Sequence, residues 1–133
     1  TASFFPDANR IITGSANGHT DIWGAFTGSQ VNEVTASSPH SIPQSPVVST
    51  LVHPDGLYGV SIHENGTLLI WETQFFKVIR TIHLGSHAIG KAQFSENGKK
   101  LLIPVLSKKP IPFRKLVLED QAIEVWDWEK LVL

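Results

Sequence analysis

The sequence predicts an all-β fold built from four-stranded antiparallel meanders. Turn signals such as Asn17-Gly18, Asn65-Gly66 and Asn97-Gly98 recur at short intervals along the 133 residues. The segments between them are short and rich in Val, Ile, Leu, Thr, Phe and Trp, which favour strands. No window keeps helical periodicity over ten or more residues.

The turns divide the chain into short candidate strands, taken here in chain order. They cover residues 10–16, 20–26, 31–35, 47–52, 57–62, 68–72, 78–82, 88–94, 100–107 and 122–128. In each of three successive units the order is strand, tight turn, strand, tight turn, a strand that carries Trp, turn and strand. This order is that of a four-stranded meander.

The three units are in register with one another. Their tryptophans, Trp23, Trp71 and Trp126, recur at intervals of 48 and 55 residues. We expect the first repeat at 1–36, with a truncated start, a Ser/Pro-rich linker at 37–46 and the second repeat at 47–84. The third repeat is expected at 85–133, with an insertion at 108–119.

A lone meander leaves two strand edges and an apolar face open, and radial stacking of such sheets covers them. Rings of this kind typically have about four to eight sheets, so three units form an incomplete ring. We expect the remaining sheets to come from sequence that is not shown or from a partner, unless the chain is a partial trace.

The pattern resembles the WD-repeat family of β-propellers, in which the third strand of each blade carries a Trp-Asp pair. The resemblance covers residues 4–128, with Trp126-Asp127 as the literal pair and Trp71-Glu72 and Trp23-Gly24 as near matches. In the family an acid lies in the turn six residues before the Trp. The resemblance therefore implies a structural signature of Asn17, Trp23, Asn65, Trp71, Asp120, Trp126 and Asp127. It also implies a hydroxyl that bonds to the Trp, for which Ser15 and Ser61 are candidates.

The composition and motifs exclude several kinds of site. The chain has no Cys, so disulfides, thiolate metal sites and a cysteine nucleophile are excluded. Its six His residues show no His-x-x-x-His spacing, and no nucleophile elbow, Walker loop or dinucleotide fingerprint is present. We therefore expect no catalytic residue, no metal site and no cofactor. No apolar run approaches the roughly 18 residues of a membrane span, so membrane insertion is not expected.

These observations predict a non-catalytic scaffold that binds other proteins within a larger multiprotein complex, inside the cell, in the nucleus or the cytoplasm. The alternatives are a propeller that contacts RNA and a non-catalytic propeller domain of a larger enzyme. The candidate partner-binding loop is the insertion at 108–119, with Lys108, Lys109, Phe113, Arg114 and Lys115.

Two further surfaces are candidates for regulation or binding. Ser38-Pro39 and Ser45-Pro46 in the linker are possible proline-directed phosphorylation sites. Phe75-Phe76 stands where the first repeat has Thr27-Gly28, and is expected either to pack under the edge of the sheet or to contact a partner.

The RNA alternative predicts a salt-dependent affinity that depends on the basic insertion. Changing Lys108, Lys109, Arg114 and Lys115 to Ala removes four cations that would contact phosphates, so RNA binding is expected to be lost. Fluorescence anisotropy with labelled single-stranded RNA at two salt concentrations measures this. An affinity that is unchanged in the variant would exclude the insertion as the RNA contact.

Overall fold

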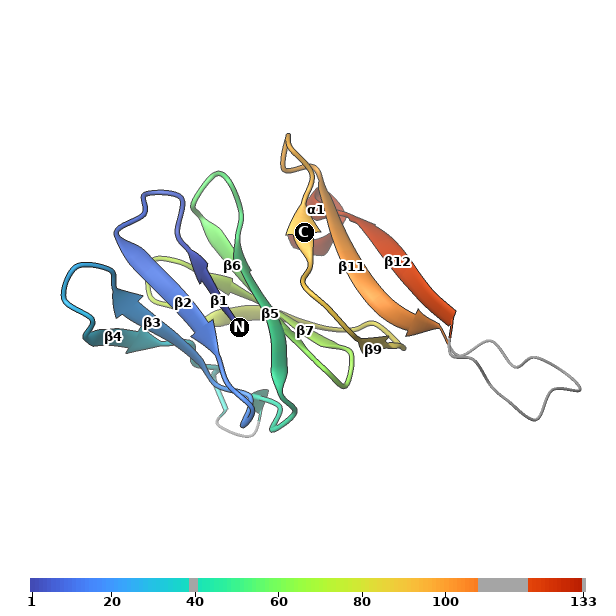
Figure 1. The fold of residues 1–133 in the computed structure, drawn as a ribbon, viewed down its shortest axis with the longest axis horizontal. Coiled ribbons are helices and arrows are strands. Elements are labelled where there is room, and N and C mark those ends of the chain that lie inside the picture. Colours follow the sequence, from blue (N-terminus) through green and yellow to red (C-terminus); the bar gives the residue numbers. More distant parts are fainter. Residues whose placement is uncertain (39–40, 108–119, 133) are drawn as a thin grey trace, which may run out of the picture.

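The computed structural model describes residues 1–38, 41–107 and 120–132, and confirms an all-β fold of three antiparallel sheets (Figure 1). In the first sheet the strands lie in the order β1 (Ala2–Phe4), β2 (Arg10–Gly14), β3 (Thr20–Gly24) and β4 (Gln30–Glu33). In the second the order is β5 (Val47–Val52), β6 (Tyr58–His63), β7 (Thr67–Glu72) and β8 (Val78–His83). Both are uninterrupted meanders, as the turn spacing predicts.

The third sheet contains β9 (His87–Ala88), β10 (Gln93–Phe94), β11 (Lys100–Ser107) and β12 (Asp120–Asp127). Its four strands occupy three positions, because β9 and β10 both pair with β11. The sequence predicted one strand at 88–94, and Pro104 on β11 explains the interruption. The carbonyl of Pro104 points to the side of β11 where β9 lies and accepts the N–H of Ile89 at 3.1 Å. Proline has no N–H with which to donate a second hydrogen bond to that side.

The sequence predicted a strand that continues to residue 128, but β12 ends at Asp127 and the chain then forms the short helix α1 (Trp128–Val132). Trp128 and Leu131, three residues apart on one face of this helix, are buried. The indole of Trp128 stacks on His53 of the second sheet, with ring centroids 5.0 Å apart and an interplanar angle of 13°, and meets Phe94 edge-on. This aromatic contact joins the third sheet to the turn between β5 and β6.

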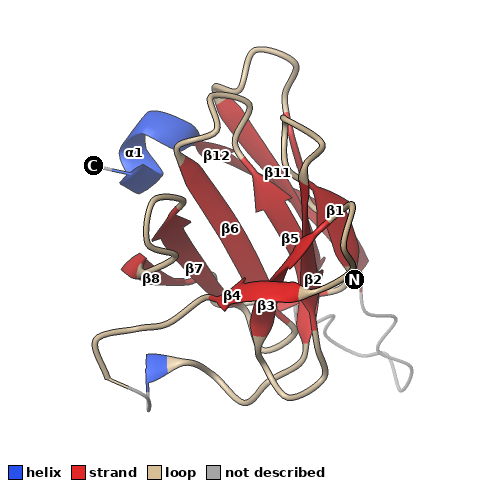
Figure 2. Cartoon of the chain, turned by 90° about the vertical axis from the view of Figure 1, so that its left-hand side faces the viewer, coloured by secondary structure: helices blue, strands red, loops and turns tan. Residues whose placement is uncertain are grey.

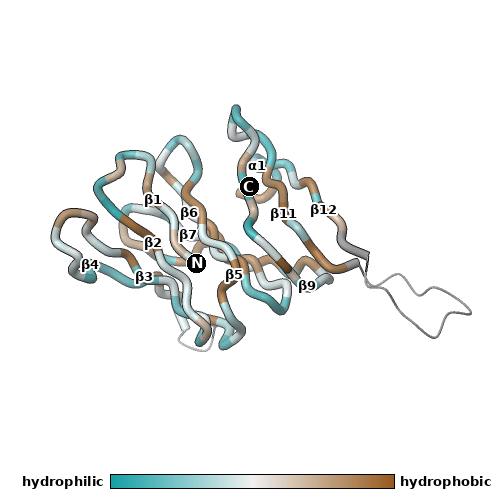
Figure 3. The backbone as a smooth tube through the Cα atoms, viewed as in Figure 1, coloured by the Kyte–Doolittle hydropathy of each residue, from teal (hydrophilic) through white to brown (hydrophobic). Residues whose placement is uncertain are grey.

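The sheets stack face to face, so that the second is covered on both sides (Figure 2). On β7, Leu68 and Ile70 pack against the third sheet, and Trp71 packs against the first. Trp71 lies directly on Gly59 of β6, where an added Cβ would come within 2.1 Å of the indole. Hydrophobic residues accordingly follow the strands, and most turns are hydrophilic (Figure 3).

The turns before the Trp strands of the first two repeats share one geometry. The side-chain Oδ1 of Asn65 accepts the N–H of Thr67 at 3.0 Å, and Asn17 does the same for His19 at 3.2 Å. Gly18 and Gly66 both have φ of 90°. At Gly66 a Cβ would also lie 2.3 Å from the carbonyl oxygen of Ser86, which precedes β9. Position 66 therefore requires glycine both for the turn and for the close approach of this segment.

A buried chain of polar groups connects the first and second sheets. The indole N–H of Trp71 donates to Ser61 Oγ at 3.1 Å, and this hydroxyl is bonded to that of Thr20 at 2.8 Å. In the first sheet the indole of Trp23 donates instead to Thr13, at 2.7 Å. The expectation for Ser15 was wrong, because Thr13 is the residue on β2 that has the register position of Ser61 on β6.

His63 is fully buried at the same interface. Its Nε2 donates to the carbonyl of Gly18 at 3.2 Å, and its Nδ1 has no hydrogen-bond partner among the residues described. Burial lowers the pKa of His63, and the carbonyl of Gly18 opposes this only in part. The packed interface therefore favours the neutral imidazole over the protonated one.

Replacing Ser61 with Ala is expected to destabilise the protein by about 1–3 kcal/mol, because it leaves the buried indole N–H of Trp71 and the hydroxyl of Thr20 without their partner. Thr13→Ala is the matched control, since it removes the same kind of bond from the half-buried Trp23. Urea unfolding followed by tryptophan fluorescence measures both. Equal losses in the two variants would contradict a special role for the buried bond.

Acid is expected to weaken the interface between the first two sheets through His63. Because its pKa is lower in the folded than in the unfolded state, the unfolded chain binds more protons, and the free energy of unfolding falls as the pH drops below about 6.5. The slope of this contribution is at most about 1.4 kcal/mol per pH unit, the limit for one proton.

Urea unfolding of wild type and His63→Gln between pH 7.5 and 5.5 measures this slope. Gln donates the same bond without titrating, so the variant is expected to lose the acid-dependent part. His87→Gln, at an exposed position, is the control. An unchanged slope in His63→Gln would show that other groups cause the acid sensitivity.

Candidate functional site

The sequence-predicted binding residues Lys108, Lys109, Phe113, Arg114 and Lys115 lie outside the residues that the structure describes. On either side of these residues, Ser107 at the end of β11 pairs with Asp120 at the start of β12. These two strands, of eight residues each, are longer than the six-residue β6 and β7. The insertion at 108–119 therefore joins the ends of an extended hairpin, and its role remains a prediction.

The signature residues of the third repeat have different partners from those of the first two. Trp126 donates its indole N–H to Glu124 at 3.0 Å, because the position that carries Ser61 in the second sheet is Ile103 here. Asp127 pairs with Lys100 and, at 3.5 Å, with Lys130. The hydrogen bond and the charge of Lys100 lower the pKa of Asp127. The Trp-Asp pair thus fixes the end of β12 and the start of α1.

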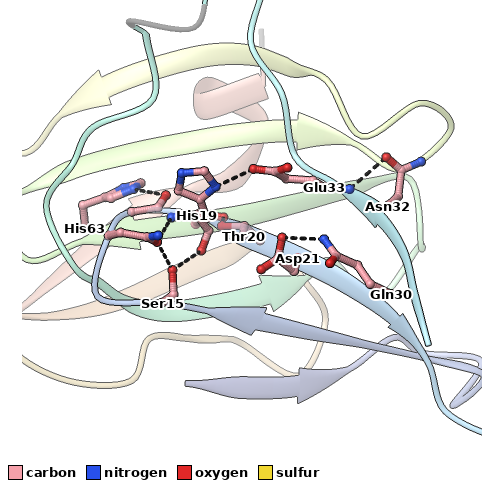
Figure 4. A network of polar contacts seen from close by, with 11 residues as sticks. Ser15, His19, Thr20, Asp21, Gln30, Asn32, Glu33 and His63 are labelled. Carbon is pink, nitrogen blue, oxygen red and sulfur yellow. Dashed lines mark hydrogen bonds and ion pairs between the residues drawn. The ribbon is translucent and has the colours of Figure 1, made fainter. Parts of the chain in front are cut away.

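A polar network lies at the end of the first sheet where β3 begins (Figure 4). Nδ1 of His19 and a carboxylate oxygen of Glu33 are 2.5 Å apart, and Asp21 accepts a hydrogen bond from Gln30 at 2.9 Å. Asp21 and Glu33 are opposite each other on β3 and β4. Burial first, and then the charge of Glu33, raise the pKa of Asp21, and His19 opposes this shift.

A pocket of about 310 Å³ opens beside this network. Polar residues line one part of it and apolar residues the other, with Asn17, His19, Glu33, Val34, Thr35, Ala36, Ile42 and Gln44 as its lining. The network and pocket hold no nucleophile paired with a base, and their hydrogen bonds are those of a turn and a strand edge. Among the residues described, the network and the pocket have the shape of a binding surface and lack the geometry of a catalytic site.

The two phenylalanines of the second repeat separate into different environments. Phe76 is buried against Phe5 and Trp71, with ring centroids 6.3 and 6.1 Å away, whereas Phe75 is exposed. Sequence reasoning left packing and partner contact open for the pair, and the structure divides the two. It missed Leu57, which is exposed in the turn between β5 and β6, and Phe26, which is exposed in the turn between β3 and β4. Aligning the repeats on their tryptophans gives no signal for Phe26, because its counterpart in the second repeat is Gln74.

Within the described parts of the chain, 1–38, 41–107 and 120–132, no three His, Asp or Glu side chains come together as metal ligands would. Within the same ranges, no helix has the length and apolar character needed to span a membrane.

The chain is similar to known proteins in sequence and in fold. No protein-family model matches it. WD repeat-containing protein 1 of Bos taurus is 29% identical over 86 residues, which are 65% of this chain and 14% of that protein. The chain thus spans a small part of the length of this relative.

Among solved structures, the hydrazine synthase of Kuenenia stuttgartiensis matches with a TM-score of 0.75 and 16% identity, over 98% of this chain and 32% of that one. At this identity the likeness concerns the fold alone. Together with the three antiparallel sheets, the similarity to a WD-repeat protein confirms the resemblance to WD-repeat β-propellers that the tryptophan repeat predicted.

Proposed function

We propose that the chain is part of a non-catalytic propeller that serves as a scaffold for other proteins in a multiprotein complex inside the cell. The observation that carries this proposal is the use of the sheet faces. The faces between neighbouring sheets are taken up by packing, while large apolar side chains remain exposed on turns and edges, among them Phe26, Leu57 and Phe75. Exposed apolar groups on a rigid framework mark surfaces for protein contact.

Equivalent positions in the three repeats support further sheets beyond the third. One and three residues before the Trp, Ile70 and Leu68 of the second sheet are 0% exposed, because the third sheet covers them. In the third sheet these positions are Val125 and Ile123, which are 60% and 66% exposed. We propose that another sheet, from further sequence or from a partner, covers this face.

The relative supports the same reading, since a WD-repeat protein shares the chain's sequence pattern over 86 residues. We propose three blade-like repeats at 1–36, 47–84 and 85–133, with the linker at 37–46 as the connection between the first two. A nuclear or a cytoplasmic location fits the proposal equally.

The scaffold proposal predicts stable and reproducible partners. Affinity purification of the intact protein at endogenous level, with quantitative mass spectrometry, is expected to recover the same proteins in independent repeats. Gel filtration with light scattering of the endogenous assembly is expected to give a mass above that of the monomer. A monomeric protein without reproducible partners would refute the scaffold role.

A further inference from the structure

The face of the third sheet that points away from the second sheet is a continuous apolar surface. Val125 on β12 is directly opposite Leu102 on β11, and Ile123 is opposite Pro104. Residues two apart on a strand point to the same side, so these side chains form two adjacent rows. Val125 and Ile123 are 60% and 66% exposed. We call Leu102, Pro104, Ile123 and Val125 the outward face.

The second sheet shows what covers an equivalent face. At the same positions in its register it carries four apolar residues that are 0% exposed, because the face of the third sheet that carries Trp126 packs on them. The first sheet is covered in the same way, since Ile12 and Ile22 share a buried cluster with Trp71. The four residues of the second sheet are Val60, Ile62, Leu68 and Ile70. The chain thus contains one type of interface twice, with a tryptophan-bearing face on an apolar face.

The first sheet presents a tryptophan-bearing face at the other end of the stack (Figure 1). Phe4, Ile11 and Trp23 are directly opposite one another on β1, β2 and β3, so they form one row. Phe4 is 63% exposed, whereas Ile11 and Trp23 are half-buried. At the same positions the second sheet has Val52 and Trp71, which pack against the first sheet. We call Phe4, Ile11 and Trp23 the tryptophan face.

We propose that two copies of the chain associate head to tail, so that the tryptophan face of each copy covers the outward face of the other. Head-to-tail interfaces form a closed ring when the rotation between the copies allows it. Two copies contribute six sheets, which is within the range of about four to eight sheets in closed rings. This inference rests on the proposed function, in which another sheet covers the third, and names a second copy as its source.

The interfaces within the chain identify one contact of the interface between copies. The hydroxyls of Thr20 and Ser61 are 2.8 Å apart across the first and second sheets. Ile123 is the counterpart of Thr20, since each lies three residues before the tryptophan of its repeat. Thr13 is the counterpart of Ser61 in register. The same packing between copies therefore places Ile123 of one copy against Thr13 of the other.

The first sheet has one charged residue where the second has a buried apolar one. Asp21 stands at the position of Leu69, which is 1% exposed. In the described part of the chain the third sheet ends at β12, whereas the first sheet continues beyond β3 with β4. The outward face is therefore narrower than the face that Leu69 packs on, and Asp21 lies at the rim of the proposed interface, where water solvates its carboxylate.

The mass of the intact, purified protein tests the association. Sedimentation equilibrium over a concentration series is expected to give twice the mass of one copy. Val125→Glu places a carboxylate without a partner in both interfaces of the ring, so the dissociation constant of the dimer is expected to rise about 100-fold or more. Val31→Glu, at a 55% exposed position on the outer strand β4, is the control and is expected to change it less than threefold.

A disulfide tests the register of the same interface. The 133 residues contain no Cys, so introduced cysteines define the bond. Positions 13 and 123 lie on opposite end sheets of one copy, so the double variant Thr13→Cys, Ile123→Cys is expected to form a covalent dimer under mild oxidation (Figure 1). Thr13→Cys combined with Ile79→Cys, on the exposed side of β8, is expected to stay monomeric on a non-reducing gel.

Each contrary outcome is distinct. An intact protein that sediments as a monomer, or as a series of assemblies larger than two copies, would overturn the two-copy ring and leave the scaffold function to the recovery of other partners. A dimer that Val125→Glu leaves intact would overturn the interface. A dimer that recovers no other protein would support the ring and refute the scaffold function. Circular dichroism and unfolding midpoints verify that the variants are folded.

Discussion

The structure depends on one constraint, the covering of both faces of the second sheet by its two neighbours. Strand β7 shows it most clearly, since five of its six residues are buried and they alternate between two neighbouring sheets. A sheet with two apolar faces is unstable alone and is stabilised only by a neighbour on each side. Glycine at position 59, the turn glycines and the buried hydroxyl of Ser61 all serve this close stacking.

The same constraint separates framework from surface. Residues that point between sheets are fixed by packing, and Ser61 satisfies the polar groups of Thr20 and Trp71 there by hydrogen bonds. Variation is left to the turns, where the three repeats differ most. The second repeat uses this freedom to fix a turn with Glu72 and expose Phe75, and the third uses it to form α1.

Sequence reasoning predicted the framework because its signals are local. Asn65-Gly66 requires a tight turn, and the apolar run up to Trp71 requires burial on both sides. The errors came from contacts that are distant in sequence or depend on register. Thr13 accepts the Trp23 bond because of the pairing of β2 with β3, whereas sequence reasoning named Ser15 as the candidate. Nothing near Trp128 indicates that His53, in another sheet, stabilises a helix there. The exposure of Phe26 and Leu57 was missed because an isolated Leu or Phe in a turn does not reveal its neighbours.

The contact of Trp128 with His53 has a consequence for the order of folding during synthesis. The turn between β5 and β6 is completed by a side chain that leaves the ribosome long after β8, the last strand of its own sheet. The second sheet can therefore pair its strands early, but it reaches its final packing only when α1 has been made. In such an array, the apolar face of each sheet provides the surface on which the next sheet packs, and the next sheet completes the packing of the one before. This order favours folding from the N-terminal side during synthesis.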